Sequence, residues 1–299
     1  MTQWTRKAER GSAWLIHLIA WLARTAGRPA CRLLLYPIVA YFVVTDPTAR
    51  RASKEFLALV RGRPTRLRDV FSHLYCFAAT LLDRVYMAAG EFDRFELEIE
   101  GRELLERADA AGRGCVLLGS HLGSFDLLML ARRLFGGRPV NVMMRVDPRA
   151  RVRRIAGVDD SAMRMIELGR ADSYLRAHEA LLRGEVVALL ADRIEPGAPG
   201  LEVEFLGRPA LLPLAPHILA ARAQAPVLMC FGLYEGGRRY RIEFSEIGPT
   251  APRASRGEAL RPVVTRYAER LESAARRRPL NWFNFYPYWD RPGPQEGEA

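Results

Sequence analysis

Short apolar runs alternate with amphipathic segments from residue 95 to residue 247, and this alternation constrains the fold more than any other feature. Each run has about the length of one strand and is bounded by glycine, proline or charged residues. Three runs predict buried strands: 114–120, 139–146 and 185–192. Four segments with helical periodicity predict helices: 104–110, 125–135, 173–184 and 213–223. Strands that alternate with helices favour an architecture with helices packed around one sheet.

Further strands make the expected sheet a mixed one. Residues 95–101 alternate apolar and acidic side chains, which is typical of a half-buried strand. Residues 225–247 predict a strand hairpin that turns at Gly236 and Gly237, and a charged helix follows at 257–278. Glu202 and Glu204 alternate in another predicted strand, and we expect both to face solvent. The expected fold class is therefore α/β, with a mixed sheet flanked by helices.

Two apolar stretches precede this pattern, at residues 12–23 and 32–44. Each is shorter than the roughly 20 residues that span a bilayer, and arginines interrupt them. Tryptophan and tyrosine side chains suit a lipid interface, so we expect a helical hairpin in the membrane surface. The alternative is a buried helix pair that caps the domain. The polar first ten residues argue against a cleavable signal peptide. The expected division is a membrane-associating segment at 1–45, a catalytic domain at 46–290 and a polar tail at 291–299.

The net charge of +11 suits an anionic partner: nucleic acid, an acidic membrane surface or an acidic protein. Nucleic-acid binding predicts arginines gathered on one face with stacking aromatics. Here the arginines are spread along the chain and the aromatics lie near its ends, so we expect no nucleic-acid partner. The four cysteines are scattered without a C-x-x-C pair, which favours reduced core residues and offers no metal site.

The segment GSHLGSFD, residues 119–126, directly follows a predicted buried strand. In α/β folds the carboxyl ends of strands are where ligands usually bind. Glycines let the backbone turn here, so the side chains of His121 and Asp126 can meet. A carboxylate on one ring nitrogen fixes the imidazole tautomer and leaves the other nitrogen free to accept a proton. The alternative is a histidine satisfied in the core and an aspartate that caps a helix.

The spacing of His121 and Asp126 matches the HxxxxD motif of the glycerolipid and lysophospholipid acyltransferase superfamily. More closely, the chain resembles the lipid A biosynthesis late acyltransferases of bacterial inner membranes. A second family block, with an acidic residue and an FFGxPA-like segment, is similar to LLADRIEPGAPGLEVEFLGRPALLP here. The terminal WFNFYPYWD resembles a branch of stand-alone predicted acyltransferases, some of which accompany aryl-polyene pigment genes.

This resemblance implies transfer of a fatty acyl group from a thioester to a hydroxyl, with His121 as general base and Asp126 orienting it. The implied co-substrate is acyl-ACP, with acyl-CoA as runner-up, and no further cofactor or metal is expected. The implied acceptor is a lipid A-like glycolipid, and the implied location is the cytoplasmic face of the bacterial inner membrane, beside an anionic surface. Alternatives are an aryl-polyene-type pigment or lysophospholipid acceptor, a hydrolase variant, or a non-catalytic membrane protein with a degenerate acyltransferase fold.

Other residues complete the expected site. Arg145, Asp192 and Arg193 follow predicted strands, and Arg145 is suited to holding a phosphate. These three residues, with Gly207 and Pro209 of the second block, are the expected substrate-binding residues. Oxyanion donors are expected near Gly207 or in the turn at 119–124. We expect His17, His73, His178 and His217 to be structural. The aromatic segment from Trp282 to Trp289 is expected to be a seal that closes the core or a lip that faces the membrane.

Overall fold

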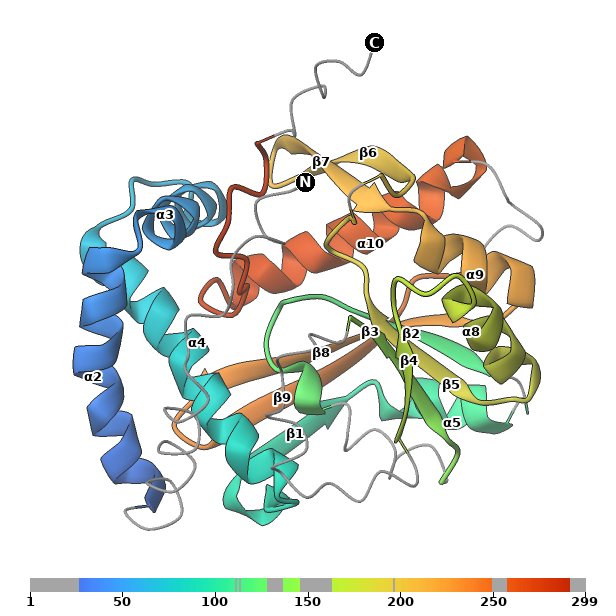
Figure 1. Ribbon diagram of the computed structural model, residues 1–299, viewed down its shortest axis with the longest axis horizontal. Coiled ribbons are helices and arrows are strands. Elements are labelled where there is room, and N and C mark those ends of the chain that lie inside the picture. Colours follow the sequence, from blue (N-terminus) through green and yellow to red (C-terminus); the bar gives the residue numbers. More distant parts are fainter. Residues whose placement is uncertain are drawn as a thin grey trace.

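The computed structural model describes residues 27–110, 112, 114–127, 137–145, 163–195, 197–248 and 257–290. A seven-stranded sheet lies at its centre, with strand order β1-β9-β8-β2-β5-β3-β4 (Figure 1). The strands are β1 (Glu96–Glu100), β2 (Cys115–Gly119), β3 (Val140–Met144), β4 (Met163–Glu167), β5 (Val186–Leu190), β8 (Val227–Gly236) and β9 (Arg239–Glu246). The α-helices are α2 (Gly27–Thr45), α3 (Pro47–Arg61), α4 (Leu67–Ala88), α5 (Arg102–Ala110), α8 (Ser173–Leu182), α9 (Ala215–Ala223) and α10 (Gly257–Arg277).

The sheet is mixed, as the sequence predicted. Strands β2, β5, β3 and β4 are parallel to their neighbours, and β8 is parallel to β2. Strands β8 and β9 form a hairpin and are therefore antiparallel to each other. The edge strand β1 is parallel to β9. The five residues of β2 are all buried, because this strand has helices over both of its faces. The predicted α/β fold is therefore confirmed.

Successive side chains along the buried strands point to opposite faces of the sheet, and each face is covered by its own hydrophobic core. Val116 and Leu118 pack into a core formed with α3, α8, α9 and α10. Cys115 and Leu117 point the other way, into a core formed with α2, α4 and α5. All four cysteines are buried and free, which confirms their predicted role as reduced core residues.

A separate two-stranded hairpin, β6 (Gly200–Phe205) and β7 (Arg208–Pro213), packs against α10. Side chains of β6 alternate between buried and exposed positions, and Glu202 and Glu204 are both exposed as predicted. Phe205 is buried at the end of β6, where its ring lies against Trp282. The hairpin thereby joins the core that contains the C-terminal aromatic segment.

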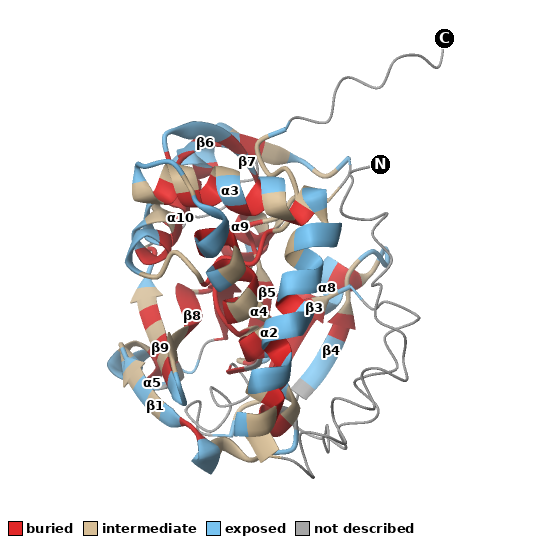
Figure 2. Ribbon diagram, turned by 90° about the vertical axis from the view of Figure 1, so that its left-hand side faces the viewer, coloured by how far each residue is buried: buried red, intermediate tan, exposed pale blue. Residues whose placement is uncertain are grey.

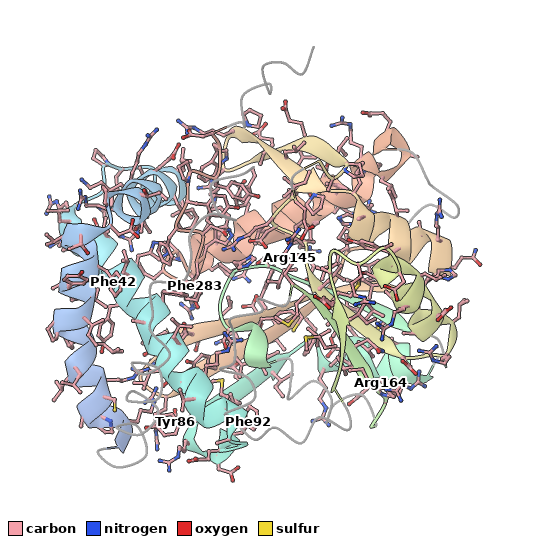
Figure 3. The ribbon with its side chains drawn as sticks, viewed as in Figure 1. Phe42, Tyr86, Phe92, Arg145, Arg164 and Phe283 are labelled. Carbon is pink, nitrogen blue, oxygen red and sulfur yellow. The ribbon has the colours of Figure 1, made fainter. Side chains whose placement is uncertain are left out.

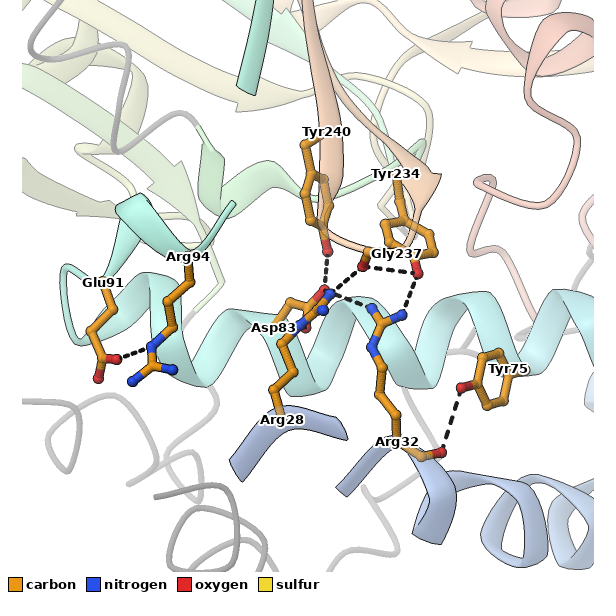
Figure 4. A network of polar contacts seen from close by, with 9 residues as sticks. All are labelled: Arg28, Arg32, Tyr75, Asp83, Glu91, Arg94, Tyr234, Gly237 and Tyr240. Carbon is orange, nitrogen blue, oxygen red and sulfur yellow. Dashed lines mark hydrogen bonds and ion pairs between the residues drawn. The ribbon is translucent and has the colours of Figure 1, made fainter. Parts of the chain in front are cut away.

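Helix α2 is attached to the sheet domain through charges (Figure 4). The buried Asp83 carboxylate of α4 accepts hydrogen bonds from Arg28 at 2.7 and 2.8 Å and from Arg32 at 2.9 Å. Tyr240 donates a further bond to Asp83, and Arg32 also donates to the hydroxyl of Tyr234. Arg28 and Arg32, two of the arginines that interrupt the apolar sequence, lie near the start of α2, and Asp83 neutralises both of them.

The opposite face of α2 is apolar and exposed (Figure 2). Cys31, Leu35 and Val39 are the buried residues of α2. The exposed fraction reaches 71% for Leu33 and 73% for Val44. Phe42 also belongs to this exposed set, and Figure 3 shows it on α2, at the side of the molecule. Within the described residues, α2 is the helix that is long and apolar enough to cross a membrane.

Some of the expected elements differ from the observed ones. Strand β4 was not predicted, because its sequence MRMIE alternates weakly between charged and apolar residues. The predicted helix 125–135 begins as a 3-10 turn, Phe125–Leu127, and its remainder lies outside the described residues. The apolar stretch 12–23, the first half of the expected hairpin, also lies outside them.

Candidate active site

His121 lies two residues after Gly119, the last residue of β2, at the carboxyl edge of the sheet. Strands β2, β5 and β3 are parallel neighbours, so their carboxyl ends meet at the same edge. Arg145 follows β3, and Asp192 and Arg193 follow β5. The sheet therefore brings to one edge the residues that the sequence predicted would emerge there.

The imidazole of His121 is held by Asp192. Nδ1 of His121 lies 2.8 Å from Oδ1 of Asp192, and the backbone N–H of His121 donates to Oδ2 at 3.0 Å. An ionised carboxylate only accepts hydrogen bonds, so Nδ1 carries the proton in this pair. The lone pair of Nε2 is then the basic site of the ring.

Asp192 is 0% exposed, yet four donors surround its carboxylate. Besides the two groups of His121, Oδ2 accepts from Nε1 of Trp282 at 3.2 Å and from Nδ2 of Asn284 at 3.0 Å. Burial alone would raise the pKa of Asp192, but the charge and hydrogen bond of His121, with Arg193 and Asn284, outweigh burial and lower it. We expected Asp192 to bind substrate; its enclosed position favours a role in holding the imidazole.

The side chain of His121 is 27% exposed, so the ring is reachable from outside the protein. Burial of the ring lowers the pKa of His121 below its usual value of 6.5, against the opposing charge of Asp192. The nearby Arg193 lowers the pKa further. The ring is therefore mainly neutral at neutral pH, as a proton acceptor must be.

The backbone N–H groups of the turn after β2 are already engaged. His121 donates to Asp192, and Leu122 donates to the hydroxyl of Ser120. Gly123 donates to the Asn281 carbonyl at 2.8 Å, and Ser124 donates to the Gly232 carbonyl at 2.7 Å. These four donors hold the turn itself in place, and the expectation of oxyanion donors near Gly207 or in the turn at 119–124 stays a prediction.

The turn lies against the second half of β8. Strand β8 has ten residues and β2 has five, so β8 continues past the end of β2. Gly123 forms a parallel bridge with Gly232 of this extension. Gly123 has a φ of 81°, and a Cβ atom there would clash with the Gly232 carbonyl oxygen. Glycine is required at position 123 for both reasons.

The C-terminal segment after α10 closes the other side of the turn. Leu122 bridges Trp282 in an antiparallel sense, and the Phe283 N–H donates to the His121 carbonyl at 2.7 Å. Phe283, labelled on this segment in Figure 3, is buried. Trp282 is completely buried against Phe56 and Phe205, which confirms the core-closing seal that was one of the two expectations. Trp282 and Asn284 were not predicted as site residues; polar asparagines within an aromatic run were the available signal.

Arg193 has partners on this segment too. Its Nε donates to Oδ1 of Asn284 at 2.6 Å, and its guanidinium lies over the ring of Tyr286. Arg145 instead forms a two-pronged ion pair with Glu195, at 2.5 and 2.7 Å. Half of the Arg145 side chain is exposed. Both cations therefore lie at the carboxyl edge, and Arg193 is the one whose charge acts on His121.

The model of a family described as bacterial lipid A biosynthesis acyltransferase matches residues 5–291. The chain belongs to this family.

Two curated relatives of this acyltransferase-family chain carry the name phosphatidylinositol mannoside acyltransferase, from two strains of Mycobacterium tuberculosis. Each is 28% identical over 196 residues, which is 64% of this chain and 59% of the relative. The match thus spans less than two thirds of the relatives' length. The family membership predicted from the HxxxxD spacing and the FLGRPA segment is confirmed.

Within its described residues, the structure does not bring two of the predicted site residues, Gly207 and Pro209, into hydrogen-bond contact with His121. Gly207 and Pro209 lie on the β6–β7 hairpin, where they line an exposed cleft of about 270 Å³ with Arg208 and Arg261. The backbone of Asp126 lies in the 3-10 turn, but its side chain is outside the described part of the structure. The contact between His121 and Asp126 stays a prediction.

The remaining described histidines serve the core or the surface. His73 is fully buried between the Ser53 hydroxyl and the Trp282 carbonyl, each at 2.9 Å. His217 is also fully buried and packs edge-on against Tyr267. His178 lies on α8, half-buried, whereas His17 is outside the described residues. In the described part of the chain, no group of three histidine, cysteine or carboxylate side chains is suited to binding a metal ion.

Proposed function

We propose that this protein is a membrane-associated acyltransferase that moves a fatty acyl group from a thioester donor to a hydroxyl of a lipid acceptor. The observation that carries the proposal is the His121–Asp192 pair at the carboxyl edge of the sheet. Family membership supports the reaction class, and the pair supplies a base of the right kind.

In the proposed reaction, Nε2 of His121 takes the proton of the acceptor hydroxyl while the oxygen attacks the thioester carbonyl carbon. The tetrahedral intermediate then collapses, the carbon–sulfur bond breaks and the leaving thiolate takes the proton from the imidazolium. The products are an ester and a free thiol. Asp192 holds Nδ1 and stabilises the imidazolium that forms transiently. General-base assistance of this kind is typically worth about 10²–10⁴-fold in rate.

Arg193 is the cation that we propose for the anionic groups of this reaction. Asn284 and Tyr286 hold its guanidinium near His121, and its charge acts on that ring. A fixed guanidinium at this position would stabilise the negative oxygen of the tetrahedral intermediate, or bind a phosphate of the substrate. Arg145 is proposed as a second phosphate contact, which requires that its ion pair with Glu195 opens.

The donor that we favour is acyl-ACP, with acyl-CoA as the alternative. An acyl carrier protein is acidic, and a net charge of +11 would steer it towards this protein. The acceptor that we favour is a lipid A-like glycolipid. The relatives' name refers to a phosphatidylinositol mannoside, so a glycolipid carrying an anionic group is common to both assignments.

Two N-terminal helices of the described structure support the proposed membrane association. The exposed apolar face of α2 is directly followed by α3, where Arg50, Arg51 and Lys54 line an open groove of about 570 Å³. Apolar side chains beside cations suit an interface of acyl chains and anionic headgroups. Helix α2 packs along α4 and its two arginines are tied to Asp83, so we propose that α2 lies in the membrane surface. The proposed location is the cytoplasmic face of the bacterial inner membrane, where thioester donors are made.

The reaction is tested with purified protein, both thioester donors and four acceptors: a lipid A precursor, a mannosylated phosphatidylinositol, a lysophospholipid and a pigment alcohol. Products are identified by mass spectrometry. We expect acyl transfer to one of the glycolipids by the wild type and loss of transfer in His121→Ala. Transfer to lysophospholipid alone would favour the alternative acceptor, and full activity of His121→Ala would refute the assigned base. No transfer to any acceptor, a pigment alcohol included, would favour a non-catalytic role.

Membrane docking is tested separately by co-sedimentation with vesicles of phosphatidylcholine, with and without phosphatidylglycerol. We expect wild type to bind the anionic vesicles and Leu33→Glu to lose binding. Leu182→Glu is the matched control, because Leu182 is 67% exposed on α8, away from this face. Equal binding of both variants would contradict the assigned face.

A further inference from the structure

Asn284 makes two contacts that connect separate parts of the site. Its Nδ2 donates to Oδ2 of Asp192 at 3.0 Å, and its Oδ1 accepts from Nε of Arg193 at 2.6 Å. The side chain is 2% exposed, so water does not compete for either contact. Because the amide oxygen is held by a guanidinium, the amide nitrogen must face the carboxylate.

The donors on Asp192 are divided unequally between its two oxygens. Oδ2 accepts from the His121 backbone, Trp282 and Asn284, whereas Oδ1 accepts from the His121 ring. Three donors on one oxygen fix the plane of the carboxylate, so the other oxygen is aimed at Nδ1. The amide of Asn284 is thus part of what directs this oxygen to the imidazole.

The second contact acts on charge. Arg193 is cationic and lowers the pKa of His121, so its position sets how basic the ring is. Asn284 holds the Nε side of this guanidinium, and Tyr286 lies under its plane. Tyr267, Tyr286 and Tyr288, the titratable groups packed around this pair, have pKa values raised by burial and stay neutral. Asp192 and Arg193 are therefore the charges in the described structure that act on His121.

We propose that Asn284 is a positioning residue, which aims the Asp192 carboxylate at His121 with its nitrogen and fixes Arg193 near the same ring with its oxygen. This inference rests on the proposed function for its catalytic meaning, but its geometry is independent of the substrate. Neither neighbour on the chain replaces it, since Phe283 and Phe285 are apolar. Asn284→Asp preserves the size and the contact with Arg193, but sets a second carboxylate against Asp192.

The test measures the pKa of His121 directly, by NMR titration of protein with isotope-labelled histidine, assigned with His121→Gln. We expect a His121 pKa below 6.5 in wild type. Asn284→Asp should raise this pKa by roughly one unit, because it adds a negative charge near the ring. Asn284→Leu should also raise it, because Arg193 loses its anchor. Trp289→Phe is the matched control: Trp289 packs on Phe205 and Trp282 in the same segment, and its Nε1 has no partner among the described residues.

The inference is overturned if folded Asn284→Asp and Asn284→Leu both titrate His121 as wild type does. It is supported if both shift the pKa while Trp289→Phe does not. Where wild type is active, the acid limb of kcat/KM should move with the NMR value, and kcat of Asn284→Asp should fall by about tenfold or more. A wild type without acyl transfer would refute the proposed function, whereas the NMR titration would still decide the role of Asn284.

Discussion

Oδ1 of Asp192 lies 2.8 Å from Nδ1 of His121, although 71 positions separate the two residues in the chain. They meet because β2 and β5 are adjacent in the sheet, so the residues that follow these strands emerge side by side. The carboxylate is buried and ionised, and the imidazole is partly exposed. This pair has the arrangement that the proposed general base requires, and Nε2 is the atom that we propose takes the proton.

Asp192→Asn should lower kcat/KM for acyl transfer by roughly 10²–10⁴-fold, because an amide cannot serve all four donors and hold the proton of Nδ1. The measurement is the initial rate with the best donor and acceptor. Asp126→Asn tests the second carboxylate predicted from the HxxxxD spacing. Asp93→Asn, an exposed carboxylate, is the control. Retention of more than half the wild-type rate by Asp192→Asn would contradict the proposed role of Asp192 in holding the His121 imidazole.

The pH dependence of kcat/KM should show an inflection below pH 6.5. The base acts in its neutral form, and burial lowers the pKa of His121, so activity rises with pH through this lowered value and is level near neutrality. A rate profile from about pH 5 to about pH 8 measures it. An inflection at or above the usual histidine value would show that the ring is not desolvated as the structure indicates.

Gly123→Ala should lower both stability and activity. Its φ of 81° costs an alanine roughly 1–2 kcal/mol, and the added Cβ meets the carbonyl of Gly232. The turn that carries His121 must then shift, and a shift of about 1 Å can cost on the order of 10²-fold in rate. Gly90→Ala is the control, since its φ is 78° and nothing lies within 4 Å of the new Cβ. Equal activity of the two variants would argue against this role of the contact.

Asp83→Asn should destabilise the protein by about 3–5 kcal/mol, because it leaves Arg28 and Arg32 largely buried without a counter-charge. Thermal or urea unfolding measures the loss. Tyr240→Phe removes one hydrogen bond to the same carboxylate and should cost only about 1–3 kcal/mol. If Asp83→Asn unfolds like wild type, the network does not hold α2.

Acid should destabilise the fold between pH 6.5 and pH 4. Burial lowers the pKa values of His73 and His217 to about 4, whereas the unfolded chain takes up these protons near 6.5. The unfolded state therefore binds more protons in this window, and the free energy of unfolding falls as pH falls. His217→Phe should remove up to about 3 kcal/mol of this fall. Urea unfolding at both ends of the window measures it, and an unchanged slope in His217→Phe would contradict the lowered pKa.

Much of the fold could be predicted because its strands are short apolar runs between turn residues. The predicted strands at 114–120, 139–146 and 185–192 lie within one or two residues of β2, β3 and β5. Their carboxyl ends also placed His121, Arg145 and Asp192 at one edge. The order of strands could not be predicted, since β5 pairs with β2 across two intervening strands, β3 and β4. The role of Asp192 depends on that order.

Two further features were hidden by local composition. The arginines of α2 looked like interruptions of an apolar stretch, because Asp83 lies 51 and 55 positions away in sequence. Asn281 and Asn284 lie among aromatic residues. The sequence pattern of this segment indicates only which side chains pack together, and it does not indicate what the asparagines bind. Their hydrogen bonds to the His121 turn and to Asp192 depend on a tertiary contact that no local pattern encodes.

Residues Asn281 to Asn284 hold the turn that carries His121, and in the chain they follow all the strands of the described sheet. A chain whose sheet has formed therefore lacks these contacts until this segment docks. Docking of a segment outside the sheet thus completes the surroundings of the imidazole.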